Sequence, residues 1–521
     1  MNQLLGANTD VLDRIAESLS ADARRVQDIR TLAQRAVAEL QAGWNGPDLL
    51  HLTQQWEQQA SPQLAGASAT LDTCAAQLRA QSAAQRGASA DDDRGAGELP
   101  AGMAASAVLG IPLLLGSGGN PPGTSTTPTT STTGPTGPTP PPASPPKHGS
   151  PADNAIWWRS LGPQQQEQVI EEHPDWIGNR DGVAFTARDR ANRALLRVDR
   201  ARFVADKERL EADLAGDWFG GAFTNDDAAL AQVKDKLASL DAIDQTLART
   251  GARQLLVLEM GPERAQAAIA RGNVDTADNV AVFVPGLSST VNDSMKGYDD
   301  NMDQLQHRAE LESKRANANQ SAATVTWIGY QAPQWSETLG SNSVSLDNAA
   351  KDGAAQLVPF LQGIGAAREH DAHLSVLGHS YGSTTAGLAL QQNTGVDDVV
   401  FFGSPGLHTS QVKDLLVPDG HAYYIEARWD PVGDLGTFGI DPSHMDGIEH
   451  ASAKQSTVVD PLTGEIRHFA EVTGHSSYLV NDSTSQYNMS VVVAGVPDRR
   501  VYDGGEGAGD VLSWPVPGTY R

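Results

Sequence analysis

The sequence predicts an α/β protein, in which a mostly parallel sheet flanked by helices follows an all-α helical hairpin and a disordered Pro/Thr-rich linker. Three observations carry this prediction. In the second half of the chain, short apolar runs alternate with helical and turn segments, which is typical of buried parallel strands joined by crossover helices. The first hundred residues instead repeat leucines at helical spacing. Residues 117–146 contain no charged side chain and hold ten of the 29 prolines.

Residues 1–100 are predicted to form two antiparallel helices. In the second of them, leucines recur every seven residues, at Leu64, Leu71 and Leu78. The first segment repeats apolar side chains at intervals close to 3.5 residues, as helices that pack on one another do. Between the segments stands Gly-Trp-Asn-Gly-Pro, in which Trp44 and Gly46 form a Trp-x-Gly motif. Its glycines permit a sharp reversal, and its proline suits the first turn of a new helix.

This hairpin resembles the WXG100 family of small helical proteins that type VII secretion systems handle, with Trp44 and Gly46 in the motif positions. The resemblance implies a helical WXG100-type partner bound through residues 1–100. The family's export tag includes a Tyr-x-x-x-Asp/Glu after the second helix, whereas this chain has no tyrosine before Tyr298. Either the partner chain supplies the tag, or the hairpin serves only for pairing. A plain dimerisation hairpin is the alternative.

Residues 101–150 are predicted to tether the hairpin to the rest of the chain. Residues 101–116 form an apolar run, shorter than the roughly 20 residues that a membrane-spanning helix needs. Packing on a neighbouring part of the chain is therefore favoured over membrane contact. The Pro/Thr-rich stretch that follows cannot bury enough apolar surface to offset the entropy of ordering, so it is predicted to be a disordered linker.

Residues 151–254 are charged and amphipathic, and they predict a helical lead-in, or cap, of the domain that follows. Trp157 and Trp158 stand near its start. Two such side chains either line a substrate pocket or anchor a core, and the core is the more common place for them.

Residues 255–500 are predicted to form the α/β core, and residues 501–521 an irregular tail. Strands are expected in six runs rich in Val, Ile, Leu and aromatic residues, at 255–260, 280–284, 324–329, 374–377, 399–402 and 423–427. A further hairpin is expected around residues 461–464.

Charge and cysteine content exclude several classes of protein. Lys and Arg total 38 against 64 Asp and Glu, a net charge of −26. Nucleic acids and anionic membranes attract basic clusters, so neither is an expected partner. The single cysteine, Cys74, excludes an intrachain disulfide framework. No cleavable signal peptide is predicted, because the first residues lack a basic region and an apolar core. The expected location is the cytoplasm, or outside the cell by a type VII-like route.

The residues that point to chemistry follow the predicted strand at 374–377. They form a Gly-x-Ser-x-Gly motif, made of Gly378, His379, Ser380, Tyr381 and Gly382. Small residues that predict a helix come next. The two glycines let backbones pass closely around a tight strand-to-helix turn, which exposes the serine at its tip. This context predicts that Ser380 is a nucleophile.

A serine hydroxyl is a weak nucleophile near neutral pH, so it needs a base and a carboxylate that orients the base. Asp430 follows the predicted strand at 423–427 and stands in the sequence Asp-Pro-Val. His475 comes 45 residues later, in Gly-His-Ser-Ser-Tyr. The order Ser, Asp, His is the one that this strand–turn–helix context requires. Ser380, Asp430 and His475 are therefore the predicted catalytic residues.

Other side chains compete for the roles of acid and base. They are Glu426, Asp434, His444, His450 and His468. Glu426 falls inside the predicted strand, Asp434 lies further into the loop, and His468 stands in an alternating run typical of a strand. His444 and His450 share a loop with two aspartates, Asp441 and Asp446, but no fixed coordination spacing is present, so no metal is predicted.

An oxyanion hole is expected from the backbone N–H groups of Leu287 and Tyr381. Leu287 follows a Pro-Gly turn at the end of the predicted strand at 280–284. Tyr381 opens the helix after the serine, where the helix dipole favours a developing anion. Loss of one such donor typically costs about 2.7–4 kcal/mol of transition-state stabilisation.

Together these motifs resemble the α/β-hydrolase superfamily, and specifically an uncharacterised actinobacterial branch with a Gly-His-Ser-Tyr-Gly elbow. The resemblance covers residues from about 154 to 500 and implies the triad Ser380–Asp430–His475 without implying a known substrate. We predict a cofactor-free serine hydrolase of the esterase or lipase type, acting on a small-molecule carboxylic ester or related acyl bond. An acyltransferase with the same triad is one alternative. A type VII-associated interaction or export-substrate protein is the other.

Overall fold

The computed structural model describes residues 141–503, apart from 217–224, 262, 335–342, 431, 433–437 and 461, together with scattered positions between 16 and 86. The chain divides into two compact units, Met1–Thr129 and Thr130–Arg521. Trp44, Gly46 and residues 101–116 lie outside the described residues. None of the described helices combines the length and apolar character needed to cross a membrane.

The described residues of the first unit are helical. Among the described residues, side-chain hydrogen bonds join an early segment to a later one in reverse order, and three examples show it. They are Arg79 to Ser20 (2.7 Å), Ser68 to the carbonyl of Ala23 (3.0 Å) and Trp56 to Gln34 (2.7 Å). The higher the residue number in the early segment, the lower the number of its partner in the later segment. Two antiparallel helices pair in this order.

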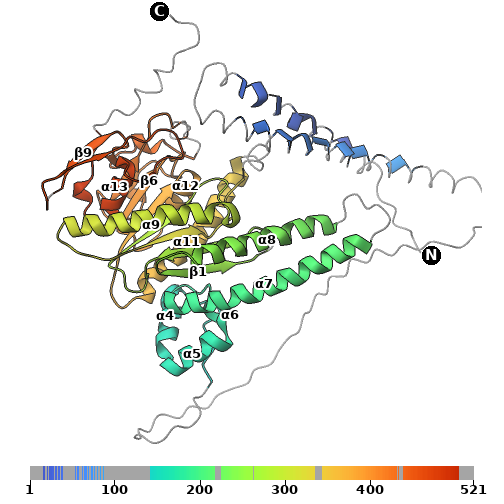
Figure 1. Cartoon of the computed structure of the whole chain (residues 1–521), viewed down its shortest axis with the longest axis horizontal. Coiled ribbons are helices and arrows are strands. Elements are labelled where there is room, and N and C mark those ends of the chain that lie inside the picture. The colour runs from blue at the N-terminus through green and yellow to red at the C-terminus, as the bar shows by residue number, and fades with distance from the viewer. Residues whose placement is uncertain are drawn as a thin grey trace, which may run out of the picture. The chain divides into compact units, whose positions relative to one another are not determined.

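The second unit opens with helices alone, in the region predicted as a lead-in (Figure 1). They are α4 (Pro151–Ser160), α5 (Pro163–Glu172), α6 (Pro174–Ile177), α7 (Phe185–Gly216) and α8 (Asn225–Leu247). Trp157 and Trp158 are only 8% and 6% exposed and pack in one apolar cluster with Leu161, Val169 and Ile177. The two tryptophans are thus core anchors of the lead-in.

The described end of the predicted linker, from residue 141 on, is hydrogen-bonded to this lead-in. Trp157 Nε1 donates to the carbonyl of Ala143 (2.9 Å), and Arg180 donates to that of Pro146 (3.0 Å). A proline-rich segment forms few hydrogen bonds of its own, because proline has no N–H. Its carbonyls are therefore free to accept from the lead-in.

An eight-stranded sheet forms the centre of the unit, in the order β1-β2-β4-β3-β5-β6-β7-β8. Its strands are β1 (Arg253–Glu259), β2 (Gln266–Arg271), β3 (Asn279–Val284), β4 (Ala322–Ile328), β5 (His373–His379), β6 (Asp398–Phe402), β7 (Ala422–Ile425) and β8 (Glu449–Ala451). Pairing is parallel from β4 to β8, whereas β2 is antiparallel to both β1 and β4. The mostly parallel sheet is as predicted, but β2 and β8 were not predicted as strands.

Helices cover both faces of the sheet, as Figure 1 shows. They are α9 (Val291–Arg315), α11 (Ser343–Ala367), α12 (Tyr381–Leu390) and α13 (Thr484–Val493). In the described connections lie the short 3₁₀ helices η2 (Val412–Asp414), η4 (Pro442–His444) and η5 (Pro497–Arg499). The expected hairpin forms a separate two-stranded sheet of β9 (Ser456–Val459) and β10 (Ile466–Phe469).

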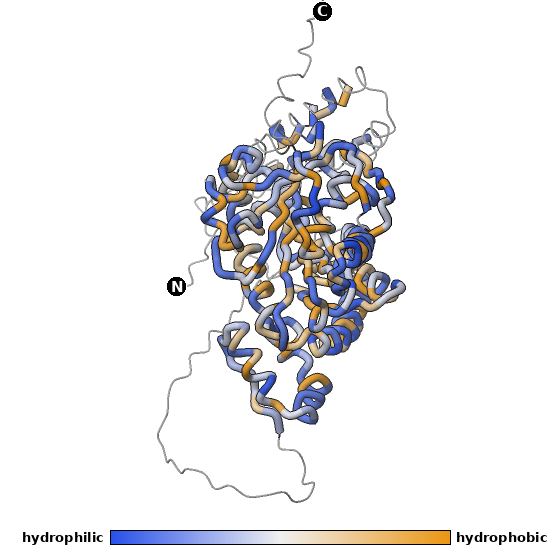
Figure 2. Tube along the Cα trace, turned by 90° about the vertical axis from the view of Figure 1, so that its left-hand side faces the viewer, coloured by the Kyte–Doolittle hydropathy of each residue, from blue (hydrophilic) through white to orange (hydrophobic). Residues whose placement is uncertain are grey.

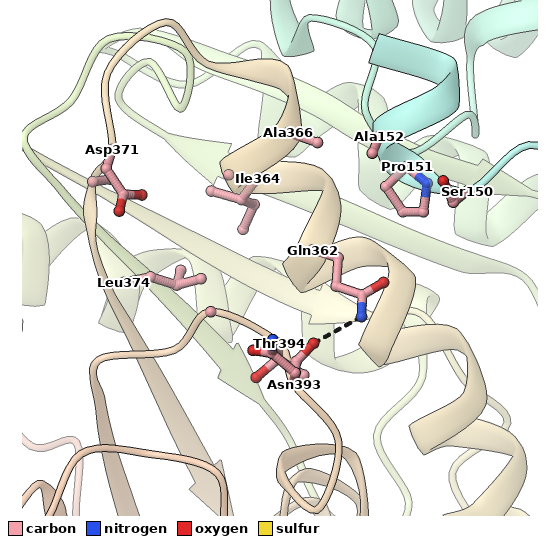
Figure 3. A pocket seen from close by; sticks show the side chains of 13 residues that line it. Ser150, Pro151, Ala152, Gln362, Ile364, Ala366, Asp371, Leu374, Asn393 and Thr394 are labelled. Atoms are coloured by element: carbon pink, nitrogen blue, oxygen red, sulfur yellow. Dashed lines mark hydrogen bonds between the residues drawn. The ribbon is translucent and has the colours of Figure 1, made fainter. Parts of the chain in front are cut away.

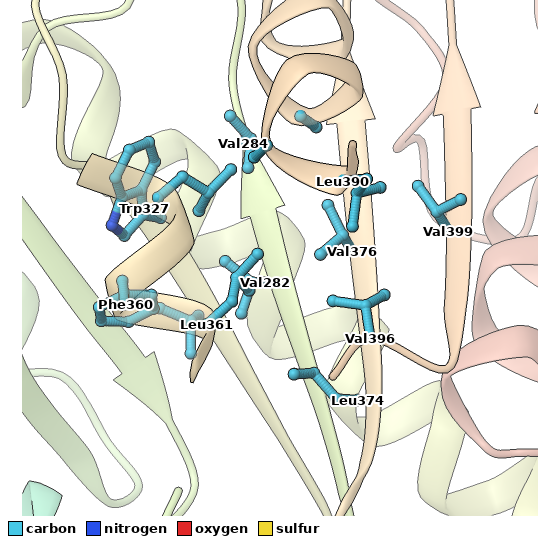
Figure 4. Close-up of a cluster of buried hydrophobic side chains, with 14 of the residues drawn as sticks. Val282, Val284, Trp327, Phe360, Leu361, Leu374, Val376, Leu390, Val396 and Val399 are labelled. Carbon is cyan, nitrogen blue, oxygen red and sulfur yellow. The ribbon is translucent and has the colours of Figure 1, made fainter. Parts of the chain in front are cut away.

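The side chains of β3 alternate between the two layers, as the period of two in a strand requires. Val282 and Val284 join the cluster that includes α11 and α12 (Figure 4), and Phe283 joins the cluster that includes α9 and α13. Apolar residues accordingly concentrate in the central strands in Figure 2. Burial on both faces explains why these strands read as continuous apolar runs.

The start of the predicted irregular tail is tied to the sheet. Tyr502 forms a bridge with Ala451 of β8, and Ser452 N donates to the carbonyl of Val501 (2.8 Å). An edge strand has unpaired backbone groups, and the chain end satisfies some of them here. Residues 504–521 lie outside the described part.

A histidine at the amino edge of the sheet should make stability depend on pH. His373 Nε2 lies 2.9 Å from the buried carboxylate of Asp398 and 3.2 Å from the carbonyl of Val492. Burial alone would lower the pKa of His373, but the hydrogen bond and charge of Asp398, helped by Asp397, raise it overall. A raised folded-state pKa stabilises the fold fully below the unfolded value of about 6.5, and this stabilisation is lost as pH rises through the folded value.

We therefore expect His373→Gln to lower the free energy of unfolding by roughly 1.5–3 kcal/mol in acidic buffer and by less in alkaline buffer. Melting temperatures of both proteins across this pH range would measure it. His468→Gln is the matched control, because the His468 ring bonds to the hydroxyl of Thr457 and not to a carboxylate. A loss that does not vary with pH would contradict the expectation.

Candidate active site

Three side chains from distant parts of the sequence form a hydrogen-bonded chain at the carboxyl edge of the sheet. The hydroxyl of Ser380 lies 2.8 Å from Nε2 of His475. Nδ1 of the same ring lies 2.9 and 3.0 Å from the two carboxylate oxygens of Asp430. Since Nδ1–H donates to the carboxylate, Nε2 is left to accept the serine proton. The structure thus brings together the three residues that the sequence predicted as catalytic.

The serine stands on a strained turn between β5 and α12. Its backbone angles are φ 54° and ψ −133°, which a non-glycine residue adopts only where the surroundings enforce it. A Cβ at Gly382 would lie 2.2 Å from the carbonyl oxygen of Val284, and one at Gly378 would lie 2.8 Å from Cα of Ser383. The two glycines of the motif are therefore required by close backbone contacts.

Two turns of backbone border the serine, one at Gly286 and one at Tyr381. Tyr381 is the first residue of α12, where N–H groups have no partner within the helix. Across from it, a Cβ at Gly286 would lie only 2.6 Å from Cβ of Ser380, so the turn that carries Leu287 passes directly beside the hydroxyl. N–H groups in such positions can stabilise negative charge on a substrate oxygen.

The carboxylate of Asp430 is held by more than the imidazole. The Tyr478 hydroxyl donates to Oδ2 (2.6 Å), and the backbone N–H of Val432 donates to Oδ1 (2.9 Å). Burial would raise the pKa of Asp430, but His475, Tyr478 and the Val432 N–H together lower it below its ordinary value. The carboxylate therefore stays ionised and can stabilise an imidazolium.

His379, which precedes the serine, lies beneath the imidazole of His475. Their ring centroids are 4.9 Å apart, and Nε2 of His379 lies 2.9 Å from the backbone carbonyl of His475. Burial and the nearby His475 lower the pKa of His379 to about 4. The ring is therefore neutral at physiological pH, and it donates its Nε2–H to the carbonyl.

Gly403, the residue after β6, borders the site although the sequence did not predict it there. It has φ 55°, and a Cβ there would lie 2.8 Å from Oδ2 of Asp430 and 3.1 Å from Nδ1 of His475. The absence of a side chain at this position leaves room for the hydrogen bonds between acid and base. Only the three-dimensional arrangement reveals this, because no local motif marks the glycine.

The four competing side chains that the structure describes are not hydrogen-bonded to Ser380 or His475 in it. Glu426 follows β7, which ends at Ile425, so its predicted place inside the strand is wrong. The His444 ring is hydrogen-bonded to Asp441, and the His468 ring to the hydroxyl of Thr457. The His450 ring contacts the ring of Tyr424. Asp434 lies outside the described residues. Across the described part of the chain, no three His, Cys, Asp or Glu side chains cluster so as to hold a metal ion.

A hollow of about 350 Å³ lies at the other end of β5 and is shown in Figure 3. Leu374, Gln362 and Thr394 contribute to its wall, and Gln362 donates to the carbonyl of Asn393 (2.8 Å). Leu374 and Ser380 are six residues apart along an extended strand, which corresponds to roughly 20 Å. This hollow is therefore separate from the serine.

Part of the chain is similar to known proteins. A family model described as alpha/beta hydrolase matches residues 261–440, which include Ser380 and Asp430. An uncharacterized protein of Mycobacterium tuberculosis is 36% identical over 243 residues, covering 44% of this chain and 88% of the relative. A second uncharacterized protein of the same species is 30% identical over 386 residues, covering 69% of this chain and 58% of that protein.

Among solved structures, a cold-adapted esterase from an Arctic intertidal metagenomic library is 11% identical. The match covers 48% of this chain and 96% of that one, with a TM-score of 0.30. The fold is of the α/β-hydrolase type. With the sequence matches, the chain belongs to the alpha/beta hydrolase family.

Proposed function

We propose that this protein is a serine hydrolase that cleaves a carboxylic ester or a related acyl bond. The observation that carries the proposal is the unbroken chain of hydrogen bonds from Ser380 through His475 to the buried Asp430. The strained backbone of the serine and the close approach of the Gly286 turn support the same conclusion.

In the proposed reaction, Oγ of Ser380 attacks the acyl carbon while Nε2 of His475 takes the hydroxyl proton. Asp430 stabilises the imidazolium that forms. The N–H groups of Leu287 and Tyr381 bind the oxyanion of the tetrahedral intermediate. The imidazolium then protonates the leaving oxygen, and an acyl-serine remains. Water, deprotonated by His475, releases the acid and restores the serine.

Labelling with a fluorophosphonate probe tests the proposal. The probe phosphonylates only activated serines, so the full-length protein should gain one adduct, and peptide mapping should place it on Ser380. Prior heat denaturation is the control, because it should abolish labelling. A folded protein that stays unlabelled would contradict the proposed function.

The nature of the acceptor separates hydrolysis from acyl transfer. With an activated ester as donor, a hydrolase releases free acid whether or not an alcohol is present, whereas an acyltransferase forms a new ester with the alcohol. A series of chromogenic esters with increasing acyl length would then define the preferred substrate.

For the first unit, we propose that residues 1–100 pair with a small helical partner of the WXG100 type. The reverse order of the hydrogen bonds between its two helical segments supports this proposal. Co-expression of the full chain with a co-encoded small helical protein should give a heterodimer by light scattering, which Trp44→Ala weakens. A chain that remains unpaired would count against it.

A further inference from the structure

Tyr478 contacts the acid of the candidate triad directly. Its hydroxyl donates to Oδ2 of Asp430 at 2.6 Å and accepts a hydrogen bond from the backbone N–H of Ala427 at 2.9 Å. The side chain is only 1% exposed. The hydroxyl proton therefore has a fixed direction, toward the carboxylate.

Both the ring and the backbone of Tyr478 make contacts that fix its position. Its ring packs against Phe402 and His379, with centroids 5.4 and 5.9 Å away. Its own carbonyl accepts a hydrogen bond from Ser485 (2.5 Å). Tyr478 also stands three residues after His475, so the base and this second donor approach the same carboxylate from one turn of the chain. A donor fixed in this way orients the carboxylate without losing side-chain entropy at the moment of reaction.

We propose that Tyr478 is a positioning residue of the active site, whose hydroxyl fixes the carboxylate of Asp430 in its ionised form and in the plane where it bonds Nδ1 of His475. The inference rests on the proposed function. Asp430 is buried, and a buried carboxylate requires several donors to remain ionised. Here His475, Tyr478 and the N–H of Val432 supply them. Removing the hydroxyl leaves both the carboxylate and the Ala427 N–H short of a partner.

Tyr478→Phe tests the inference because it keeps the ring and removes only the hydroxyl. We expect kcat/KM for a chromogenic ester to fall by about tenfold to a hundredfold, the range for losing a hydrogen bond to a charged group. The acid limb of the pH profile should also move to higher pH. The less stabilised carboxylate holds the imidazolium proton more tightly, so the base becomes free only at higher pH. A purely structural role would not move this limb.

Tyr424→Phe is the matched control. Tyr424 is also 1% exposed, and its hydroxyl has no hydrogen-bond partner among the described residues. Removing it should change neither the rate nor the pH profile. Melting temperatures of both variants would show whether each is folded.

A double-variant cycle separates action through Asp430 from independent damage. Tyr478→Phe should slow fluorophosphonate labelling in the wild-type background and should have little further effect in an Asp430→Asn background. Additive effects, or a Tyr478→Phe profile that matches the wild type, would overturn the inference.

If Tyr478→Phe fails to fold, 3-fluorotyrosine at position 478 keeps the hydroxyl and makes it a stronger donor. The acid limb should then move to lower pH, and an unchanged limb would overturn the inference.

These results are distinguishable from a failure of the proposed function. If the wild-type protein does not react with the probe, the hydrolase proposal fails. If the wild type reacts and Tyr478→Phe reacts identically, only the role of Tyr478 fails.

Discussion

Ester hydrolysis by Ser380→Ala should fall by a factor on the order of 10⁶ in kcat, the loss measured when the nucleophile of a serine hydrolase is removed. The methyl group leaves no atom to form the acyl-enzyme, and His475 then has no hydroxyl to deprotonate. The oxyanion N–H groups and the binding surface remain, so a small acceleration over water should persist. The fold should persist too, because losing the serine hydroxyl removes a hydrogen bond but no packing.

Initial rates and probe labelling of the purified variant would measure this effect. Ser476→Ala is the control, because Ser476 is exposed and directly follows His475 in the chain. It should keep both the wild-type rate and the labelling. If Ser380→Ala kept more than about one per cent of the wild-type rate, the ester chemistry would not pass through this serine.

The sequence predicted the central strands because each is buried on both faces and therefore uninterrupted by polar side chains. It failed at β2, whose sequence Gln-Ala-Ala-Ile-Ala-Arg is rich in alanine, a helix former. Here tertiary context decides: β2 lies between β1 and β4, where buried alanines make room for the layers above and below. At β8 only three residues pair, too few for any pattern to show.

The residues of the candidate site also fall into two groups, those that the sequence predicted and those that it did not. Ser380 and Asp430 were predictable because each follows a predicted strand, and His475 because it stands in a loop motif at the expected place in the chain order Ser, Asp, His. Gly403 and Tyr478 were not, since their importance comes from atoms that approach them across the fold. A glycine after a strand is common, and a tyrosine three residues after a histidine carries no signal without the distance to Asp430.

Gly403→Ala should lower kcat/KM by about a hundredfold, the cost of misplacing a catalytic group by about 1 Å. The new methyl group would lie 2.8 Å from Oδ2 of Asp430 and 3.1 Å from both Nδ1 and Cε1 of His475. These distances are shorter than carbon contacts allow, so either the carboxylate or the imidazole must move. Either movement lengthens the hydrogen bond that holds the base in its productive tautomer. Steady-state kinetics with a chromogenic ester would measure the loss.

Gly403→Ala would both strain the backbone at a positive φ and crowd Asp430 and His475. A second glycine with a positive φ but no such neighbours separates the effect of strain from the effect of crowding. Gly420 also has a positive φ, 80°, but a Cβ there would have no atom within 4 Å. Gly420→Ala therefore carries the conformational cost of about 1–2 kcal/mol in stability without touching the site. We expect it to lower the melting temperature and to leave kcat/KM unchanged, whereas Gly403→Ala should lower both. Equal kinetic effects of the two substitutions would mean that the space beside Asp430 is not what Gly403 provides.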